Sequence, residues 1–212
     1  MAEALVICGL GVQVPEETTL ETLQALGDCR VVFSDLADAK AFAWLKGYCA
    51  VLRRSAKASE ILAEARRGGV GLAVWGHPQF SSSLARRVQA SARKAGLTFR
   101  VLGAISPVGS AFARTVSFLG GDYGYQGLQA YEVATLLEDP KAFTPELPLV
   151  LYAEQAKPEQ WRAALKAVGR GYADGHEVRV FPRDGTSSTM TLAAARRLDL
   201  KGGLVFLAPK KP

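Results

Sequence analysis

The sequence contains few of the side chains from which catalytic and metal sites are most often built. It has two histidines, His77 and His176, and three cysteines, Cys8, Cys29 and Cys49, which are widely spaced and form no CxxC pair. Zinc sites need several such ligands, usually in close local pairs, so we expect no metal site. The GxSxG, phosphate-binding-loop and HExxH motifs are also absent, which argues against the enzyme classes that they define.

Long apolar runs are absent too, because no stretch reaches the length that a membrane-spanning helix needs. The first residues lead directly into a strand pattern, without the basic region and small-residue cleavage site of a secretory signal. The odd number of cysteines, each in or beside an apolar run, predicts reduced core residues. We therefore expect a soluble, cytoplasmic protein.

Acidic residues are outnumbered by basic ones, and the formal net charge is +6 with a pI of about 9.3. Such a charge suits an anionic partner. The basic residues, however, are scattered along helical patterns in pairs: Arg53-Arg54, Arg66-Arg67, Arg86-Arg87 and Arg196-Arg197. No aromatic-rich basic stripe accompanies them, so we interpret the pairs as solvated helix faces and do not expect a nucleic-acid partner.

Apolar strand-like runs alternate with amphipathic helical patterns, which predicts an α/β protein. In the first half the predicted strands are 4–8, 30–33, 48–52, 71–75 and 97–102, and the predicted helices are 18–27, 37–45, 55–67, 82–94 and 107–117. In the second half they are strands 128–131, 149–153, 178–181 and 204–207 and helices 133–138 and 158–168, with a short helix before the last strand. The wider strand spacing there allows antiparallel pairs.

A segment rich in glycine and tyrosine, residues 120–127, is typical of a linker or loop. We therefore predict two α/β domains, residues 1–118 and 119–212. The first helix should begin at a Thr18-Thr19 cap and turn Leu20, Leu23 and Leu26 toward the core.

The stretch from Gly71 to Phe80 is the most informative part of the sequence. A short apolar run ends in Gly76-His77-Pro78, after which a helical pattern begins. A buried strand followed by a glycine turn and a helix creates a crevice at the strand's carboxyl end, where open α/β sheets bind ligands. An ordinary strand–helix turn has the same pattern, so the shape alone leaves both interpretations open.

The first predicted strand also ends in a glycine loop, Gly9-Leu10-Gly11, and Asp35 follows the second strand. A dinucleotide fingerprint needs a third glycine three residues past the second, at the start of a helix. Val14 stands there and the helix begins later, so the dinucleotide interpretation is weak. Two glycines still permit a ligand to approach the backbone closely.

Several segments, taken in order, resemble the tetrapyrrole methylase family of S-adenosylmethionine-dependent methyltransferases. The matching segments are the opening strand with its glycine loop (residues 5–11), the helix start Thr18-Thr19-Leu20, Gly76-His77-Pro78 with Phe80, residues 102–106, residues 149–153, residues 183–186 and residues 204–209. The Gly-His-Pro loop stands where the family has Gly-Asp-Pro. The resemblance extends over nearly the whole chain.

This resemblance implies two α/β domains with S-adenosylmethionine bound in the cleft between them, commonly in a homodimer. It implies cofactor contacts from the first glycine loop, the Gly-His-Pro loop and two later segments: Gly9, Leu10, Gly11, Gly76, His77, Pro78, Ser106 and Ala153. Tyr131 and Tyr125 are the candidates for the substrate side. A methyl sulfonium is already activated, so such an enzyme mainly has to align the two reactants and exclude water.

The Gly-His-Pro variant and residues 129–133 are more similar to the branch that contains borosin peptide N-methyltransferases. The tyrosine- and arginine-rich insert of those enzymes is missing before the helix that starts near Ser55. We therefore expect a methyltransferase that acts on a small molecule or a peptide, with the acceptor open. Two alternatives stay open, a non-catalytic module that binds S-adenosylmethionine or S-adenosylhomocysteine and an rRNA methyltransferase.

Overall fold

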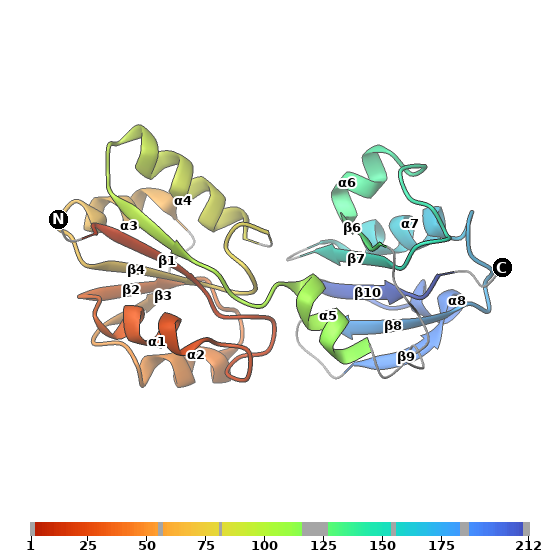
Figure 1. Ribbon diagram of the computed structural model, residues 1–212, viewed down its shortest axis with the longest axis horizontal. Coiled ribbons are helices and arrows are strands. Elements are labelled where there is room, and N and C mark those ends of the chain that lie inside the picture. Colours follow the sequence, from red (N-terminus) through yellow and green to blue (C-terminus); the bar gives the residue numbers. More distant parts are fainter. Residues whose placement is uncertain are drawn as a thin grey trace. The chain divides into compact units, whose positions relative to one another are not determined.

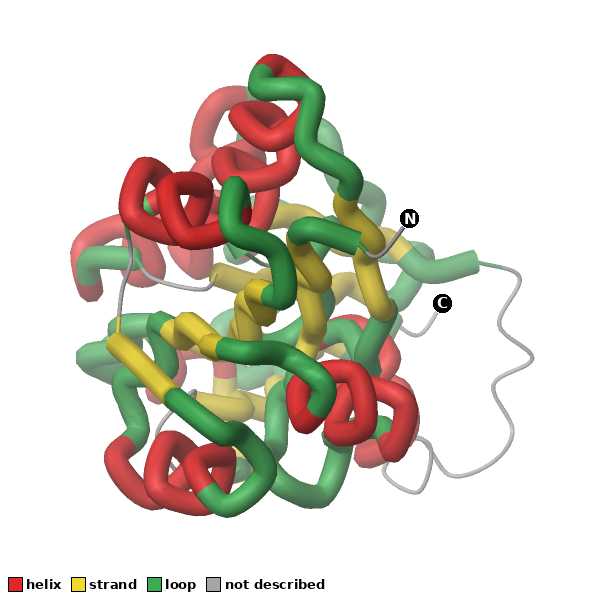
Figure 2. Tube along the Cα trace, turned by 90° about the vertical axis from the view of Figure 1, so that its left-hand side faces the viewer, coloured by secondary structure: helices red, strands yellow, loops and turns green. Residues whose placement is uncertain are grey.

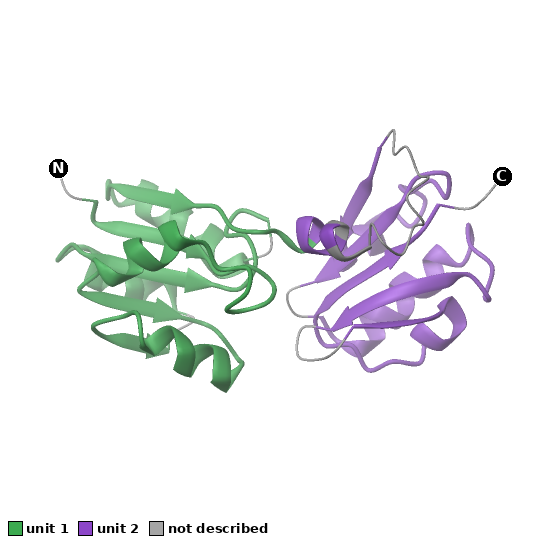
Figure 3. Cartoon of the chain, turned by 60° about the horizontal axis from the view of Figure 1, so that its bottom comes forward, with its two compact units in different colours: residues 1–107 green, residues 108–212 purple. Residues whose placement is uncertain are grey.

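In the computed structural model, strands alternate with helices along most of the chain, except that strand Glu177–Pro182 is followed directly by strand Ser188–Thr191 among the described elements. Figure 2 distinguishes the helices and strands by colour. The structure describes residues 3–54, 57–80, 82–115, 127–153, 156–182 and 187–209. They divide into two units, unit 1 with residues 1–107 and unit 2 with residues 108–212 (Figure 3). The predicted α/β class is confirmed, with one sheet in each unit.

The sheet of unit 1 is wholly parallel. Its strands are β1 (Leu5–Gly9), β2 (Val31–Ser34), β3 (Leu52–Arg54), β4 (Val70–Val74) and β5 (Phe99–Leu102), in the order β3-β2-β4-β1-β5. Every residue of β1, β2 and β4 is buried. Strands covered on both faces have no solvent side, which explains why these segments are continuously apolar in the sequence.

Two pairs of helices cover the two faces of this sheet (Figure 1). Helices α1 (Leu20–Gly27) and α2 (Ala39–Lys46) pack on one face, where Leu26 and Leu45 belong to the same apolar cluster. Helices α3 (Ala58–Ala65) and α4 (Ser83–Lys94) pack on the other face, where Ile61 and Val88 share a second cluster. Each helix therefore follows its strand in the alternation that the sequence predicts.

The first turn of α1 differs in one respect from the prediction. Thr19 is the N-cap, as predicted, and its hydroxyl oxygen accepts a hydrogen bond from the Thr22 N–H at 3.2 Å. Leu20, however, is 78% exposed, and the buried residues are Thr22, Ala25 and Leu26. The Thr22 hydroxyl donates to the Gly9 carbonyl oxygen at 3.3 Å, and this bond turns the Thr22 face of the helix toward the sheet.

Unit 2 contains a mixed sheet. Its elements are α5 (Pro107–Thr115), β6 (Gln129–Glu132), α6 (Val133–Glu138), β7 (Leu149–Ala153), α7 (Pro158–Val168), β8 (Glu177–Pro182), β9 (Ser188–Thr191), α8 (Leu192–Ala195) and β10 (Gly203–Leu207). The strand order is β6-β7-β10-β8-β9. Only the β6–β7 pair is parallel among these described strands, so the expected antiparallel pairs are present.

Alternate residues of the unit 2 strands enter two different cores. Leu149 and Leu151 face the cluster that contains Trp161 of α7, whereas Val150 between them faces the cluster that contains Ala111 of α5. Helix α5 therefore packs with unit 2, and the division falls between Pro107 and Val108. The predicted boundary between residues 118 and 119 lies outside the described residues.

Within the described part of the chain, no helix combines the length and hydrophobicity needed to cross a membrane.

Candidate functional site

Three loops of unit 1 meet at one edge of its sheet. They follow β1, β4 and β5, which are adjacent in the strand order, and parallel strands end on the same side. Gly11 and Gly76 form an isolated bridge, in which the Gly76 N–H donates to the Gly11 oxygen at 2.8 Å and the Gly11 N–H donates to the Gly76 oxygen at 3.4 Å. The glycine loop and the Gly-His-Pro loop therefore form one backbone junction.

Side chains are excluded from this junction. A Cβ atom on Gly9 would lie 2.5 Å from the Gly76 oxygen, 2.6 Å from the Ala104 Cβ and 2.8 Å from the Pro78 Cδ. Gly11 has a φ of +80°, which favours glycine, and a Cβ there would lie 2.5 Å from the Glu17 Cβ. The packing of the loops against one another is thus enough to require both glycines.

Glu17 closes the loop that follows β1. Its Oε2 accepts hydrogen bonds from the backbone N–H groups of Val12, at 2.7 Å, and Gln13, at 3.1 Å. The Trp75 indole N–H donates to the Val12 oxygen at 3.0 Å and joins this loop to the end of β4. Neither Glu17 nor Trp75 was predicted for the site, because a lone glutamate or tryptophan carries no signal of such contacts.

His77 bridges the second and third loops. Its Nδ1 accepts a hydrogen bond from the Gln79 N–H at 3.2 Å, so the neutral ring carries its proton on Nε2. A Cβ on Gly103 would lie 3.3 Å from that Nε2, so the imidazole occupies the space beside Gly103. Burial lowers the pKa of His77 below its usual 6.5, which favours the neutral ring. Gly103 lies in the segment 102–106 that matches the family, but no contact was predicted for it from the sequence.

The remaining predicted residues occupy different environments. The Leu10 side chain is completely buried in the core of unit 1, so only its backbone belongs to the loop. Ser106 is half-buried in the loop between β5 and α5. In unit 2, Ala153 is buried at the end of β7, and the Tyr131 hydroxyl donates to the Ala142 oxygen at 2.7 Å. Tyr125 lies outside the described residues.

The three loops present mainly backbone groups at this edge, and the described side chains beside them do not form a general acid–base pair. Cys8 directly precedes Gly9, but burial raises the pKa of its thiol far above the usual range, so the thiol stays neutral. Ile105 is 42% exposed and gives the third loop an apolar side chain at the surface. Such an edge can hold and orient a ligand, which is sufficient for a reaction whose donor is already activated.

The fold is that of an α/β protein with three loops at the carboxyl ends of adjacent parallel strands, which is where open α/β sheets bind ligands. The sequence pattern of the Tetrapyrrole (Corrin/Porphyrin) Methylases matches residues 4–196, and the chain belongs to this family. Membership places it among the methyltransferases that use S-adenosylmethionine, as the segment order in the sequence implied.

Solved structures share this fold over nearly the entire chain. A candidate diphthine synthase from Entamoeba histolytica is 17% identical with a TM-score of 0.72, and the match covers 98% of this chain and 93% of that one. Uroporphyrin-III C-methyl transferase from Thermus thermophilus, complexed with S-adenosyl homocysteine, is 16% identical with a TM-score of 0.69 and 96% coverage of both chains. The methyltransferase CobJ is 15% identical with a TM-score of 0.66, and the match covers 99% of this chain and 95% of that one. No curated protein matches the sequence.

Proposed function

We propose that the chain binds S-adenosylmethionine at the edge of unit 1 where the three loops meet, and that it methylates a small molecule or a peptide. The observation that carries the proposal is the Gly11–Gly76 backbone junction, with His77 packed beside Gly103. The Thermus thermophilus relative was solved with S-adenosyl homocysteine, the product that methyl transfer leaves behind. Family membership and this geometry thus support the same proposal.

In this proposal the residues of the edge have separate roles. Gly9, Gly11 and Gly76 allow the loops to pack closely, and the buried Leu10 side chain anchors the first loop in the core. His77 and Pro78 fix the second loop against the third. Bound S-adenosylmethionine would supply the activated methyl group, so the protein has only to orient it and keep water away.

Four further residues are proposed to lie beside the cofactor or on the acceptor side. Ser106 would contribute its hydroxyl beside the cofactor, and Ala153 would contribute backbone, because its side chain is buried. Tyr131 and Tyr125 are proposed for the acceptor side.

We further propose a cytoplasmic homodimer, which light scattering would detect as twice the chain mass of 22.6 kDa.

Isothermal titration with S-adenosylmethionine and S-adenosylhomocysteine tests the cofactor site directly. We expect micromolar binding, equivalent to about −8 kcal/mol. Gly76→Val should abolish it, because Gly76 has a φ of +67° and belongs to the junction. Gly175→Val is the matched control, because a Cβ on Gly175 meets nothing within 4 Å.

Absence of binding to both compounds, or full affinity in a folded Gly76→Val variant, would contradict the proposed site. Transfer of a labelled methyl group to candidate small molecules and peptides tests turnover separately. Binding without transfer to any acceptor would favour the non-catalytic module, and transfer to ribosomal RNA alone would favour the rRNA methyltransferase.

A further inference from the structure

Positive charge is concentrated in one part of unit 1. Between residues 53 and 100 the sequence has ten lysines and arginines against two acidic residues, Glu60 and Glu64. This local excess is larger than the net charge of the whole chain, +6. Residues 1–52 have the opposite balance, with seven acidic and three basic residues.

The fold places the helices of these two stretches on opposite faces of the sheet. The basic stretch contains α3 and α4, which pack against each other on one face, whereas the acidic stretch contains α1 and α2 on the other (Figure 1). We define the cationic face by the exposed basic residues of the α3–α4 side: Arg53, Arg66, Arg67, Arg86, Arg87, Arg93 and Lys94. Two of the pairs that are scattered in the sequence, Arg66-Arg67 and Arg86-Arg87, thus share one surface with Arg53.

Helix α4 contributes the most regular part of this face. It has four basic residues and no acidic one, and its buried side is Leu84, Ala85, Val88, Gln89 and Ala92. Arg86 and Arg93 are seven residues apart, as are Arg87 and Lys94, so each pair lies on one side of the helix. The members of a pair are separated along the axis by roughly 10 Å, at the usual rise per residue.

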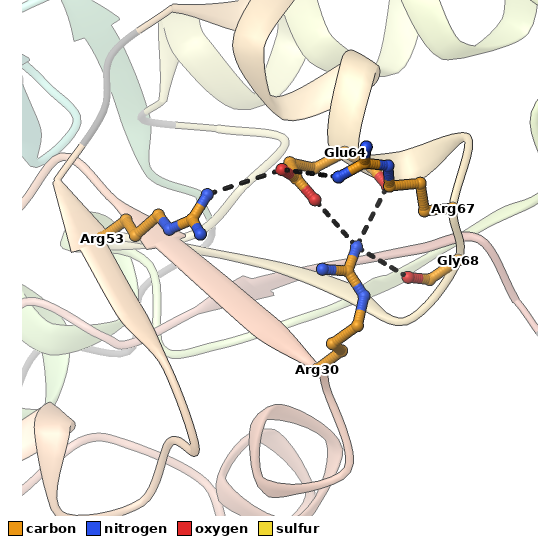
Figure 4. Close-up of polar contacts among 5 residues, drawn as sticks. All are labelled: Arg30, Arg53, Glu64, Arg67 and Gly68. Atoms are coloured by element: carbon orange, nitrogen blue, oxygen red, sulfur yellow. Dashed lines mark hydrogen bonds and ion pairs between the residues drawn. The ribbon is translucent and has the colours of Figure 1, made fainter.

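A cluster around Glu64 adds one more arginine, Arg30, to this face and joins it to Arg53 and Arg67 (Figure 4). The Glu64 carboxylate pairs with Arg30 at 2.9 Å, Arg53 at 3.5 Å and Arg67 at 3.7 Å, and Arg30 also reaches the Gly68 oxygen at 3.4 Å. One carboxylate cannot neutralise three guanidinium groups. Each arginine side chain is also 46–75% exposed, so the cluster presents oriented, positively charged donors to the solvent.

From this arrangement we propose that the cationic face docks the phosphodiester backbone of an RNA. Most of its cations are arginines, whose forked N–H groups match phosphate oxygens. Protein interfaces usually have an apolar core, and helices that insert into a membrane surface bury an apolar face. The large hydrophobic side chains exposed in the described residues, Leu20, Tyr48, Val51 and Ile105, lie outside α3 and α4, so these helices offer neither. Binding to a phosphodiester backbone needs no apolar anchor, because the contacts are between cations and phosphate oxygens.

RNA is the nucleic acid that fits this face best. Recognition of DNA commonly inserts a helix into the major groove, but α3 and α4 lie side by side against the sheet and cover it together. Double-stranded RNA is bound largely through its shape and backbone, which requires only a surface with spaced cations. The docking proposal is independent of the proposed methyl transfer, because the face lies on α3 and α4 rather than on the three loops.

Fluorescence anisotropy with a short labelled RNA duplex tests the proposal. The variant is Arg87→Gln/Lys94→Gln, which removes two exposed cations from one side of α4. Lys166→Gln/Arg170→Gln is the matched control, since it removes two exposed cations from unit 2. We expect the α4 variant to bind roughly tenfold more weakly and its log–log salt slope to fall by about 2, as for two lost phosphate contacts. The control should match the wild type.

Three results would overturn the proposal: no RNA binding even at low salt, an equal loss in both variants, or tighter binding of anionic lipid vesicles or of a DNA duplex with the same sequence. An equal loss would mean that net charge alone drives the binding. Titration of the α4 variant with S-adenosylmethionine should give wild-type affinity. The docking proposal and the cofactor proposal can therefore fail separately.

Discussion

Gly9 lies where the three loops of unit 1 meet, and its lack of a side chain has a measurable consequence. We expect Gly9→Ala to lower the free energy of unfolding by about 1–3 kcal/mol, as overpacking does elsewhere. The added methyl group would approach the Gly76 oxygen and the Pro78 ring, and neither can move without displacing the second loop. Urea unfolding measures the loss, and titration with S-adenosylmethionine should show weaker binding.

Gly175→Ala provides the control for this experiment. A Cβ on Gly175 meets nothing within 4 Å, and its φ is outside the range that favours glycine. Its free energy of unfolding should therefore stay within about 0.5 kcal/mol of the wild type. A Gly9→Ala variant as stable as the Gly175→Ala variant would show that the loops are looser than the structure indicates.

His77 should give the stability of the protein a specific pH dependence. Its pKa in the folded protein is below 6.5 because burial disfavours the charged ring. As the pH falls through 6.5, the unfolded chain takes up a proton at His77 that the folded chain does not. The free energy of unfolding is therefore unaffected by His77 above that pH, and it decreases as the pH falls from 6.5 toward the pKa of His77 in the folded protein.

His77→Asn should remove this contribution. We expect the wild type to lose more stability than the variant between neutral and mildly acidic pH, and denaturant unfolding at a series of pH values measures the difference. Parallel pH profiles for the two proteins would mean that the His77 ring is solvated in the folded state.

At the scale of single elements, Trp161 holds α7 against the sheet of unit 2. Its side chain is completely buried, and its Nε1 has no hydrogen-bond partner among the residues that the structure describes. Trp161→Ala should cost about 3–5 kcal/mol of unfolding free energy because it leaves a large cavity. Trp161→Phe should cost about 1 kcal/mol or less, because losing an unsatisfied N–H offsets part of the lost packing.

Differential scanning calorimetry of the two variants checks this order. Equal losses in Trp161→Phe and Trp161→Ala would show that the indole N–H makes a bond essential to α7. Both substitutions are at the same position, so a difference between their unfolding free energies reflects the side chain and not the backbone around it.

Much of this element pattern could be predicted from local sequence. The bounds of α7 were predicted correctly because Pro158 favours a first helical turn and Gly169 follows the last one. Strand β9 was missed, because Ser-Thr-Met-Thr has the polar composition of an edge strand. Strand β3 was placed too early, at 48–52, because the apolar residues precede the pairing residues Arg53 and Arg54.

The loops of the candidate site could be located in the sequence where the backbone needs glycine, whereas the cofactor contacts expected from them stay predictions. Gly9, Gly11 and Gly76 stand out in the sequence. Trp75 and Gly103 join these loops through contacts between distant segments, and Glu17 closes its own loop through local hydrogen bonds that a lone glutamate does not signal. The gathering of basic pairs on one face is equally hidden, because it depends on which side of the sheet each helix covers. Local patterns give the elements, and tertiary contacts decide what these elements bring together.

At the scale of the whole molecule, each unit has its own interior. The two clusters of unit 1, around Ile61 and Leu26, contain residues from that unit alone, and the clusters around Trp161 and Phe206 contain residues of unit 2 alone. The five strands of the parallel sheet also come entirely from residues 1–107. A chain of about 100 residues is long enough to bury a core by itself.

A fragment of residues 1–107 should therefore fold without the rest of the chain. We expect it to give a dispersed amide spectrum by NMR and a cooperative thermal transition by circular dichroism, because no apolar cluster of unit 1 loses a member. Trp161→Ala in the full chain is the complementary test, since it should lower the stability of unit 2 and leave a transition that matches the fragment. A fragment with collapsed amide dispersion and no transition would mean that unit 1 depends on contacts supplied by residues 108–212.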